Sequence, residues 1–149
     1  MPDPLNNALL KFHHFGLAVC QPGAARTFLS SLGYRMGETV FDPEQNVHLA
    51  LCQHDEDPAV EIIWPGSVPG PIDALTQLHG SGIIYHVCYE TGDLAGVLSR
   101  FKVAGLRVMC ISSPKTARLF VGRKVSFYNV IGIGLIELLE PVRDLATTG

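Results

Sequence analysis

The amino-acid sequence predicts an α+β fold made of two tandem modules, each with the element order strand, helix and three further strands. The same pattern of apolar runs and turn residues occurs on both sides of a linker at 66–80, and the pairs Pro65-Gly66 and Pro69-Gly70 interrupt the chain at its start. Nineteen residues separate His14 from Gly33, and nineteen also separate His86 from Gly105. Because duplicated modules keep equivalent residues at equivalent places, the two halves are in register.

The first module is expected at about 11–65. Its helix is indicated by apolar side chains at helical spacing and by Gly33 as a left-handed stop. The residues expected on the apolar face of this helix are Ala25, Phe28, Leu29 and Leu32. The strands predicted in this module are Phe12–Val19, Arg35–Phe41, Val47–Cys52 and Val60–Trp64.

The second module is expected at about 81–142, after a linker that carries one helix over Ile72–His79. Its own helix ends at Gly105. The residues expected on the apolar face of that helix are Leu94, Val97, Leu98 and Phe101. The predicted strands are Ile83–Glu90, Arg107–Ser112, Lys124–Asn129 and Leu135–Leu139. We expect the whole chain, 1–149, to form a single domain.

Composition excludes several classes of function. The net charge is −3, and 47% of the residues are hydrophobic while 17% are charged, so there is no basic surface field to attract nucleic acid or an anionic membrane. The apolar runs end well short of the roughly 18 residues that a membrane-spanning helix needs. The first residues, Met-Pro-Asp-Pro-Leu-Asn-Asn, lack the basic and apolar regions of a signal peptide, so we expect a cytoplasmic protein.

The four cysteines are widely spaced and form no Cys-x-x-Cys pair. Three of them lie inside or beside apolar stretches typical of strands. We therefore expect buried free thiols rather than disulfides or metal ligands. The cysteines are Cys20, Cys52, Cys88 and Cys110.

A carboxylate, Glu137, stands in the middle of the apolar run Ile131–Pro141. An ionised carboxylate in a buried strand costs several kcal/mol unless a cation or hydrogen bonds meet it. Glu61 holds the corresponding position in the first module, 47 residues after His14, and Glu137 follows His86 by 51. Taken alone, a strand histidine is more often a hydrogen-bonded core or surface residue, and a strand glutamate usually faces solvent. The occurrence of such a histidine and such a glutamate in both modules favours a shared role for all of these residues.

Strand parity places His14, Glu61, His86 and Glu137 where they can converge, if the two modules close one curved mixed sheet around a cleft. His13 falls on the opposite face by the same rule. Two imidazoles and two carboxylates suit a hard or borderline divalent cation, and without a thiolate they do not suggest a structural zinc site. The expected cofactor is one divalent metal ion (Co, Mn, Ni, Fe, Zn or Mg).

Several motifs resemble the vicinal oxygen chelate superfamily, also called the glyoxalase, bleomycin-resistance and dioxygenase group, over roughly Lys11–Val142. They are His14-Phe-Gly-Leu-Ala-Val, Val60-Glu-Ile-Ile-Trp-Pro, His86-Val-Cys-Tyr-Glu and Leu135-Ile-Glu-Leu-Leu-Glu-Pro. The resemblance implies paired βαβββ modules, one curved mixed sheet around a metal-binding cleft, and the four ligands named above. It also implies a homodimer. The fold alone does not define the reaction.

Within this superfamily the chain is most similar to methylmalonyl-CoA epimerases, through its length, its single linker and the turn Glu44-Gln-Asn-Val. That similarity implies a metal-dependent isomerase that removes and returns an α-proton next to a thioester through a metal-stabilised enolate. Glu44 and Glu137 would then be the catalytic pair. A solvated turn carboxylate is the alternative for Glu44.

Other functions remain open at this point. Glu61 stands where the epimerases typically have glutamine and looks more like bacterial glyoxalase I, which favours a glyoxalase I-like lyase. The segment from Phe127 to Glu137 is shorter than the usual loop of the epimerases. An Fe(II) oxygenase that uses His14, His86 and Glu137 as ligands is a further alternative, as is a non-catalytic protein that binds a ligand in the cleft.

A group of cations precedes and begins the strand predicted at Lys124–Asn129. Lys115, Arg118 and Arg123, with Lys124, could hold a phosphate or carboxylate of a CoA-like substrate. The alternative is a solvated loop with charges that flank strands. The expected partner is a small molecule such as an acyl-CoA, with no nucleic acid and no membrane.

Overall fold

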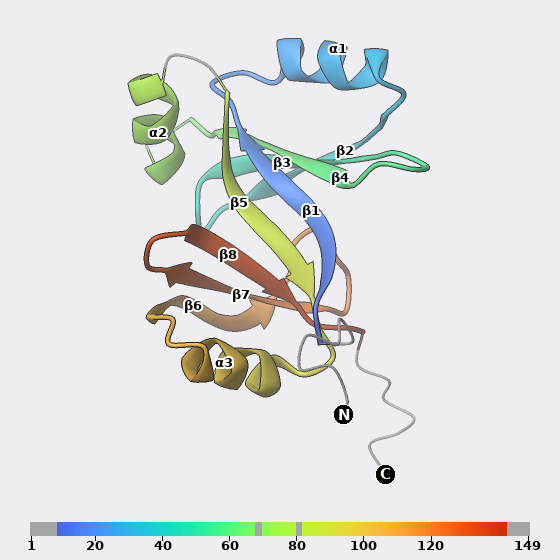
Figure 1. Ribbon diagram of the computed structural model, residues 1–149. Coiled ribbons are helices and arrows are strands. Elements are labelled where there is room, and N and C mark those ends of the chain that lie inside the picture. The colour runs from blue at the N-terminus through green and yellow to red at the C-terminus, as the bar shows by residue number, and fades with distance from the viewer. Residues whose placement is uncertain (1–8, 68–69, 80–81, 143–149) are drawn as a thin grey trace. The chain divides into compact units, whose positions relative to one another are not determined.

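The computed structural model describes residues 9–67, 70–79 and 82–142, and this part of the chain contains eight strands and three helices. The predicted α+β class and the order strand, helix and three strands in both modules are confirmed (Figure 1). The chain divides into two compact units. The N-terminal unit is His14–Val87, and the C-terminal unit combines Met1–His13 with Cys88–Gly149.

The boundaries of these units fall inside two strands, β1 (Lys11–Ala18) and β5 (Ile83–Glu90). They therefore differ from the linker at 66–80 that separates the sequence repeats. The compact units and the sequence modules are two different divisions of the chain, because β1 and β5 contribute to both units. The single domain over 1–149 stays a prediction.

The N-terminal unit contains a mixed sheet with the strand order β2-β3-β4-β1-β5. Here β1 pairs with β4 in parallel, while the β2–β3 and β3–β4 pairs are antiparallel. The other elements of this unit are α1 (Gly23–Ser31), β2 (Arg35–Asp42), β3 (Val47–Gln53), β4 (Ala59–Pro65) and α2 (Pro71–His79). The strands and α2 were predicted to within one residue at each end.

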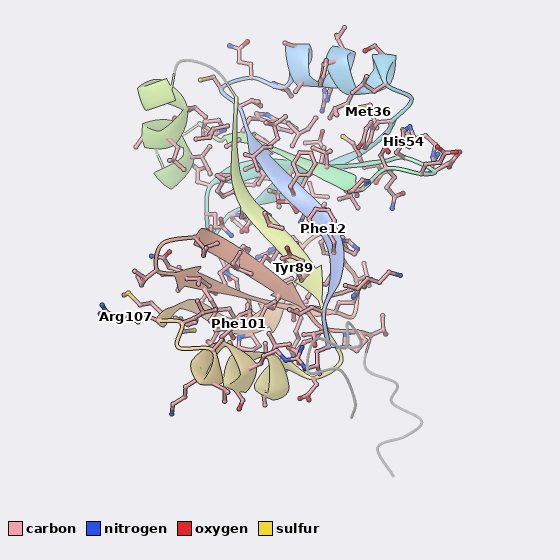
Figure 2. All side chains as sticks on the ribbon, in the orientation of Figure 1. Phe12, Met36, His54, Tyr89, Phe101 and Arg107 are labelled. Atoms are coloured by element: carbon pink, nitrogen blue, oxygen red, sulfur yellow. The ribbon has the colours of Figure 1, made fainter. Side chains whose placement is uncertain are left out.

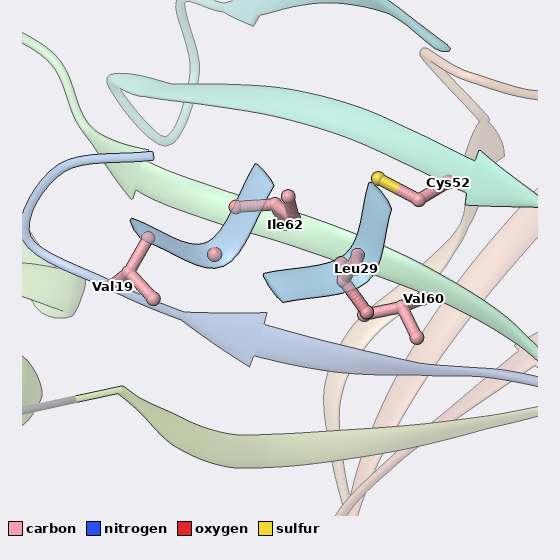
Figure 3. Packing of buried hydrophobic residues seen from close by; sticks show 6 residues of the cluster. Val19, Leu29, Cys52, Val60 and Ile62 are labelled. Atoms are coloured by element: carbon pink, nitrogen blue, oxygen red, sulfur yellow. The ribbon is translucent and has the colours of Figure 1, made fainter. Parts of the chain in front are cut away.

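Helix α1 covers one face of this sheet, and the core lies between them (Figure 3). Its buried members are Val19, Ala25, Leu29, Cys52, Val60 and Ile62. Because side chains alternate along a strand, the opposite face of the same strands is left for other residues. That opposite face carries the candidate site.

The predicted apolar face of α1 is only half right. Ala25 and Leu29 are buried, whereas Phe28 is 61% exposed and Leu32 is 50% exposed. A short helix on a sheet buries a narrow stripe, so apolar residues beside that stripe stay in contact with solvent. The helix ends as predicted, because Gly33 has a φ of 94°.

A histidine ties the end of α1 to the β3–β4 loop. His54 lies 3.1 Å from the carbonyl oxygen of Leu32 through Nε2, and its Nδ1 accepts hydrogen bonds from the backbone N–H groups of Glu56 and Asp57. The ring of Tyr34 packs against that of His54. Burial, and then the charge of Asp57, raise the pKa of Tyr34.

The C-terminal unit has the strand order β5-β8-β7-β6. Its remaining elements are α3 (Leu94–Val103), β6 (Val108–Thr116), β7 (Lys124–Val130) and β8 (Gly134–Leu139). Asp93 caps α3 by accepting a 2.9 Å hydrogen bond from the backbone N–H of Gly96. Phe12 packs edge-on against Tyr89, with ring centroids 5.6 Å apart (Figure 2).

One strand prediction in this unit needs correction. Strand β6 extends to Thr116 instead of ending at Ser112, because register shifts let it continue past Ser112 along β7. Strand β8 begins one residue before the predicted Leu135, and residues 131–133 of the apolar run form a turn. Gly132 and Gly134 have φ values of 88° and 122°, which only glycine adopts readily, and they close the β7–β8 hairpin.

The four cysteines are free, as predicted, but only Cys52 and Cys88 are buried. Cys20 is exposed because it lies in the turn after β1, and Cys110 is exposed on β6, an edge strand. Burial raises the pKa of the Cys52 thiol. Among the described residues, no helix is both long and apolar enough to cross a membrane.

Candidate metal centre

Three of the predicted ligands meet in the N-terminal unit, on the sheet face opposite α1. His14 comes from β1, Glu61 from β4 and His86 from β5. Nε2 of His14 lies 3.4 Å from Oε2 of Glu61 and 3.5 Å from Nε2 of His86. One ligand atom from each residue lies within 4.8 Å of the other two. Strand parity thus brings these side chains together as the sequence predicted.

All three side chains are withdrawn from water. His14 is 0% exposed, Glu61 is 6% exposed and His86 is 2% exposed. Burial of an ionised carboxylate costs several kcal/mol unless positive charge or hydrogen bonds compensate it. A cation bound beside the two imidazoles would therefore stabilise the buried carboxylate of Glu61.

The arrangement fits a divalent metal ion. Two ligand atoms about 2.1 Å from one ion are about 3.0 to 3.4 Å apart at octahedral or tetrahedral angles. The two separations in the structure, 3.4 and 3.5 Å, are close to that range. Two imidazole nitrogens and a carboxylate oxygen suit Mn, Fe, Co, Ni or Zn better than a soft ion. His14, Glu61 and His86 could hold such an ion with small movements.

Glu137 lies in the C-terminal unit, in the middle of β8. It is 3% exposed and is paired in register with Phe127 of β7. Leu138 and Leu139, which follow it, are fully buried. The interpretation of Glu137 as a carboxylate within a buried apolar strand agrees with this environment. Its role as a metal ligand and catalytic group stays a prediction.

Glu44 is exposed in the turn between β2 and β3. The carboxylate of Asp42, which is only 3% exposed, accepts a 2.9 Å hydrogen bond from the backbone N–H of Glu44 and so shapes this turn. Sequence reasoning identified the turn but not Asp42 as the residue that orients it. The Asp-Pro-Glu sequence was the available signal. The catalytic role of Glu44 stays a prediction.

The three predicted substrate-binding cations lie in the C-terminal unit in different environments. Arg123 is held by Glu90, with Nη2 2.9 Å from Oε2, and its Nε donates a 2.8 Å hydrogen bond to the carbonyl oxygen of Glu140. Lys115 is half-buried on β6, and Arg118 is exposed in the following loop. The guanidinium of Arg123 thus stabilises the local structure, whether or not it also binds a substrate.

Comparison with known proteins gives the family. The model of the Glyoxalase/Bleomycin resistance protein/Dioxygenase superfamily matches residues 13–127. An ethylmalonyl-CoA/methylmalonyl-CoA epimerase of Cereibacter sphaeroides is 27% identical over 106 residues, which cover 70% of this chain and 78% of the relative.

Solved structures support the same fold. A methylmalonyl-CoA epimerase from Mycobacterium tuberculosis superposes with a TM-score of 0.74 at 20% identity, covering 95% of each chain. A variant of the Streptomyces coelicolor methylmalonyl-CoA epimerase, in complex with 2-nitronate-propionyl-CoA, gives a TM-score of 0.69 at 18% identity and covers 91% of this chain and 99% of that one. The family and these relatives indicate an enzyme. With a family model that matches most of its length, the chain belongs to the Glyoxalase/Bleomycin resistance protein/Dioxygenase superfamily.

Proposed function

We propose that this chain is an acyl-CoA epimerase that inverts the configuration at the α-carbon of a carboxylated acyl-CoA such as methylmalonyl-CoA. The observation that carries the proposal is the buried cluster of His14, Glu61 and His86, with ligand-atom separations of 3.4 and 3.5 Å. The related enzyme from Cereibacter sphaeroides, described as an ethylmalonyl-CoA/methylmalonyl-CoA epimerase, supports the substrate class.

His14, Glu61 and His86 would hold a divalent metal ion, and Glu137 is proposed as the fourth ligand. Glu137 is supported by its burial, its place in the middle of a strand and its position in the second repeat, which corresponds to that of Glu61 in the first. The bound ion would supply positive charge where negative charge develops on the thioester oxygen during proton removal. His86→Ala should abolish stoichiometric metal in protein purified without chelators.

Epimerisation needs one group to remove the α-proton and another to return a proton on the opposite face. We assign these tasks to Glu44 and Glu137. The exposed position of Glu44 supports exchange of its proton with water, while the buried position of Glu137 supports a desolvated proton donor and acceptor. Each carboxylate would change its protonation state once per turnover.

Lys115, Arg118 and Arg123 are proposed to interact with the anionic part of the acyl-CoA. Their positive charges lie close together in the sequence around the end of β6 and the start of β7. Since Arg123 already pairs with Glu90, its contribution would be to fix the local backbone as well as to add charge. Charge-reversing variants should raise KM more than they lower kcat.

A glyoxalase I-like lyase is the second candidate, and one observation favours it. Glu61 provides a carboxylate, rather than an amide, 3.4 Å from His14 at the centre of the cluster. The hemithioacetal of methylglyoxal and glutathione is the substrate that tests this candidate.

The deciding experiment offers both substrates to protein loaded separately with Co(II), Mn(II) and Ni(II) in deuterium oxide. We expect methylmalonyl-CoA to acquire deuterium at the α-carbon as its configuration inverts, and we expect Glu44→Gln and Glu137→Gln to lose this inversion, because each variant lacks one of the two proton-transfer groups. Turnover of the hemithioacetal without exchange into methylmalonyl-CoA would replace the epimerase assignment by the lyase. Glu38→Gln, at an exposed position in β2, serves as the control.

A homodimer in the cytoplasm completes the proposal. The dimer rests on the family resemblance, and the two exposed free thiols, Cys20 and Cys110, are consistent with a reducing compartment. Light scattering coupled to gel filtration should give twice the 16.2 kDa mass of the chain. A monomer at micromolar concentration would contradict the dimer.

A further inference from the structure

A glycine in the middle of β1 lies between the ligands of the candidate metal centre. Gly16 is on the same face of β1 as His14, because side chains at alternate positions share a face. On one side its register partner is Glu61 of β4, and on the other side β1 neighbours β5, which carries His86. The backbone of Gly16 therefore lies between the strands that carry Glu61 and His86.

The backbone at this position does not require glycine. Positive φ angles occur at five of the described glycines, and Gly16 is not among them. The five are Gly33, Gly105, Gly122, Gly132 and Gly134. A glycine inside a strand weakens it, because it packs no side chain and loses more freedom on folding. The reason for glycine must therefore lie in the space above the strand.

That space is filled by the imidazole of His86. A Cβ atom built on Gly16 would lie 2.5 Å from Nδ1 and 2.8 Å from Nε2 of His86, inside the 3.0 Å limit that real Cβ contacts respect. His86 is 2% exposed, so its ring could turn away only by displacing close-packed neighbours. The ring of His86 is seated directly on the backbone of Gly16.

The second sequence module provides an internal comparison. Cys88 follows His86 by two residues, as Gly16 follows His14 by two. Cys88 is fully buried, so the repeated fold accepts a side chain at this position of the strand. The need for glycine at position 16 therefore comes from the space that the ring of His86 occupies there, and not from the backbone of the strand.

We infer that Gly16 is a positioning residue of the metal centre, which seats His86 so that its Nε2 faces that of His14. The inference rests on the proposed metal-dependent function. Any side chain at position 16 forces the ring of His86 out of its place. Since residues that orient metal ligands typically account for about 10- to 100-fold in metal affinity, Gly16→Ala should weaken metal binding by that factor.

Titration with Co(II), read by visible absorption and by competition with a chelating dye, tests this inference without an activity assay. Gly16→Ala should bind Co(II) at least about tenfold more weakly than the wild type, with a changed ligand-field spectrum. Gly23→Ala is the matched control, because a Cβ on Gly23 meets nothing within 4 Å. The control should keep both the affinity and the spectrum of the wild type.

A double-mutant cycle with His86→Ala separates the proposed contact from a general effect on β1. Without the imidazole, the added methyl group of Gly16→Ala has nothing to displace, so in the His86→Ala background it should leave the Tm of the metal-free protein unchanged. An equal decrease of this Tm in the wild-type and His86→Ala backgrounds would overturn the inference. Absence of Co(II) binding by the wild type would instead overturn the proposed function, and the Tm values of the metal-free variants would still decide whether Gly16 seats His86.

Discussion

Glu61 is the proposed ligand whose charge can be removed with the least change of shape. Glu61→Gln keeps the size of the side chain but deletes a negative charge that is 6% exposed and 3.4 Å from His14. An ion bound by both residues would lie nearer to this carboxylate than His14 does, and at an effective dielectric constant of about 20, unit charges 3.4 Å apart already interact by about 5 kcal/mol. Burial of the carboxylate offsets part of this, and we expect a net loss of about 2.7 kcal/mol, or a hundredfold in metal affinity.

Metal-dependent thermal stability measures this loss directly. Free Co(II) at 100 times the wild-type Kd stabilises the folded state by about 2.7 kcal/mol, which raises the Tm of a domain of this size by about 5 to 11 °C. Because Glu61→Gln is expected to bind Co(II) a hundredfold more weakly, the same Co(II) concentration would only equal the Kd of this variant. The stabilisation would then be about 0.4 kcal/mol and the Tm shift about 1 to 2 °C.

The control for this prediction is Glu56→Gln, which removes an exposed carboxylate from the β3–β4 loop. It should retain the full Tm shift with Co(II). If Glu61→Gln shows the same shift as the wild type and the control, Glu61 does not bind the metal, and the interpretation of the buried cluster as a metal centre is wrong.

Three further predictions follow from burial and charge. Glu137→Gln should lower metal affinity and catalysis while circular dichroism shows an intact fold; unfolding with metal binding unchanged would make Glu137 a structural carboxylate. Iodoacetamide at pH 8 should modify Cys20 and Cys110 in the native protein within minutes, whereas Cys52 should react only after unfolding, as followed by mass spectrometry. Because burial raises the pKa of the Cys52 thiol, its contribution to stability is complete below the unfolded-state pKa of about 9 and is lost as the pH rises through the folded-state pKa. Urea unfolding at pH 8 and pH 10 should therefore show a smaller decrease in stability for Cys52→Ala than for the wild type.

The elements that could be predicted from the sequence depend on local chemistry. Strand β5 was predicted with its observed limits, Ile83–Glu90, because an apolar run is bounded there by Gly82 and Thr91-Gly92. The ends of α1 and α3 were predicted because Gly33 and Gly105 adopt positive φ angles that glycine accepts without strain.

Predictions of burial were weaker, because burial depends on what packs against an element. Phe28 has the spacing of a core residue in α1, yet it is 61% exposed, since the sheet covers only a narrow stripe of the helix. Cys110 lies in an apolar strand, yet it is exposed, since β6 is the edge of its sheet. The periodicity of one segment does not show which elements pack against it or whether it lies at the edge of a sheet.

For the candidate centre, the sequence by itself determined which residues to consider. Equal spacing from a glycine identified His14 and His86, and similar spacing from these histidines identified Glu61 and Glu137, because duplicated strands place equivalent side chains on equivalent faces. Only the tertiary structure decided that they meet at 3.4 and 3.5 Å, and that Gly16 leaves room for the ring of His86. The physical reason is that β1, β4 and β5 are far apart in the chain but adjacent in the sheet, so the space between their side chains depends on strand pairing and not on sequence distance.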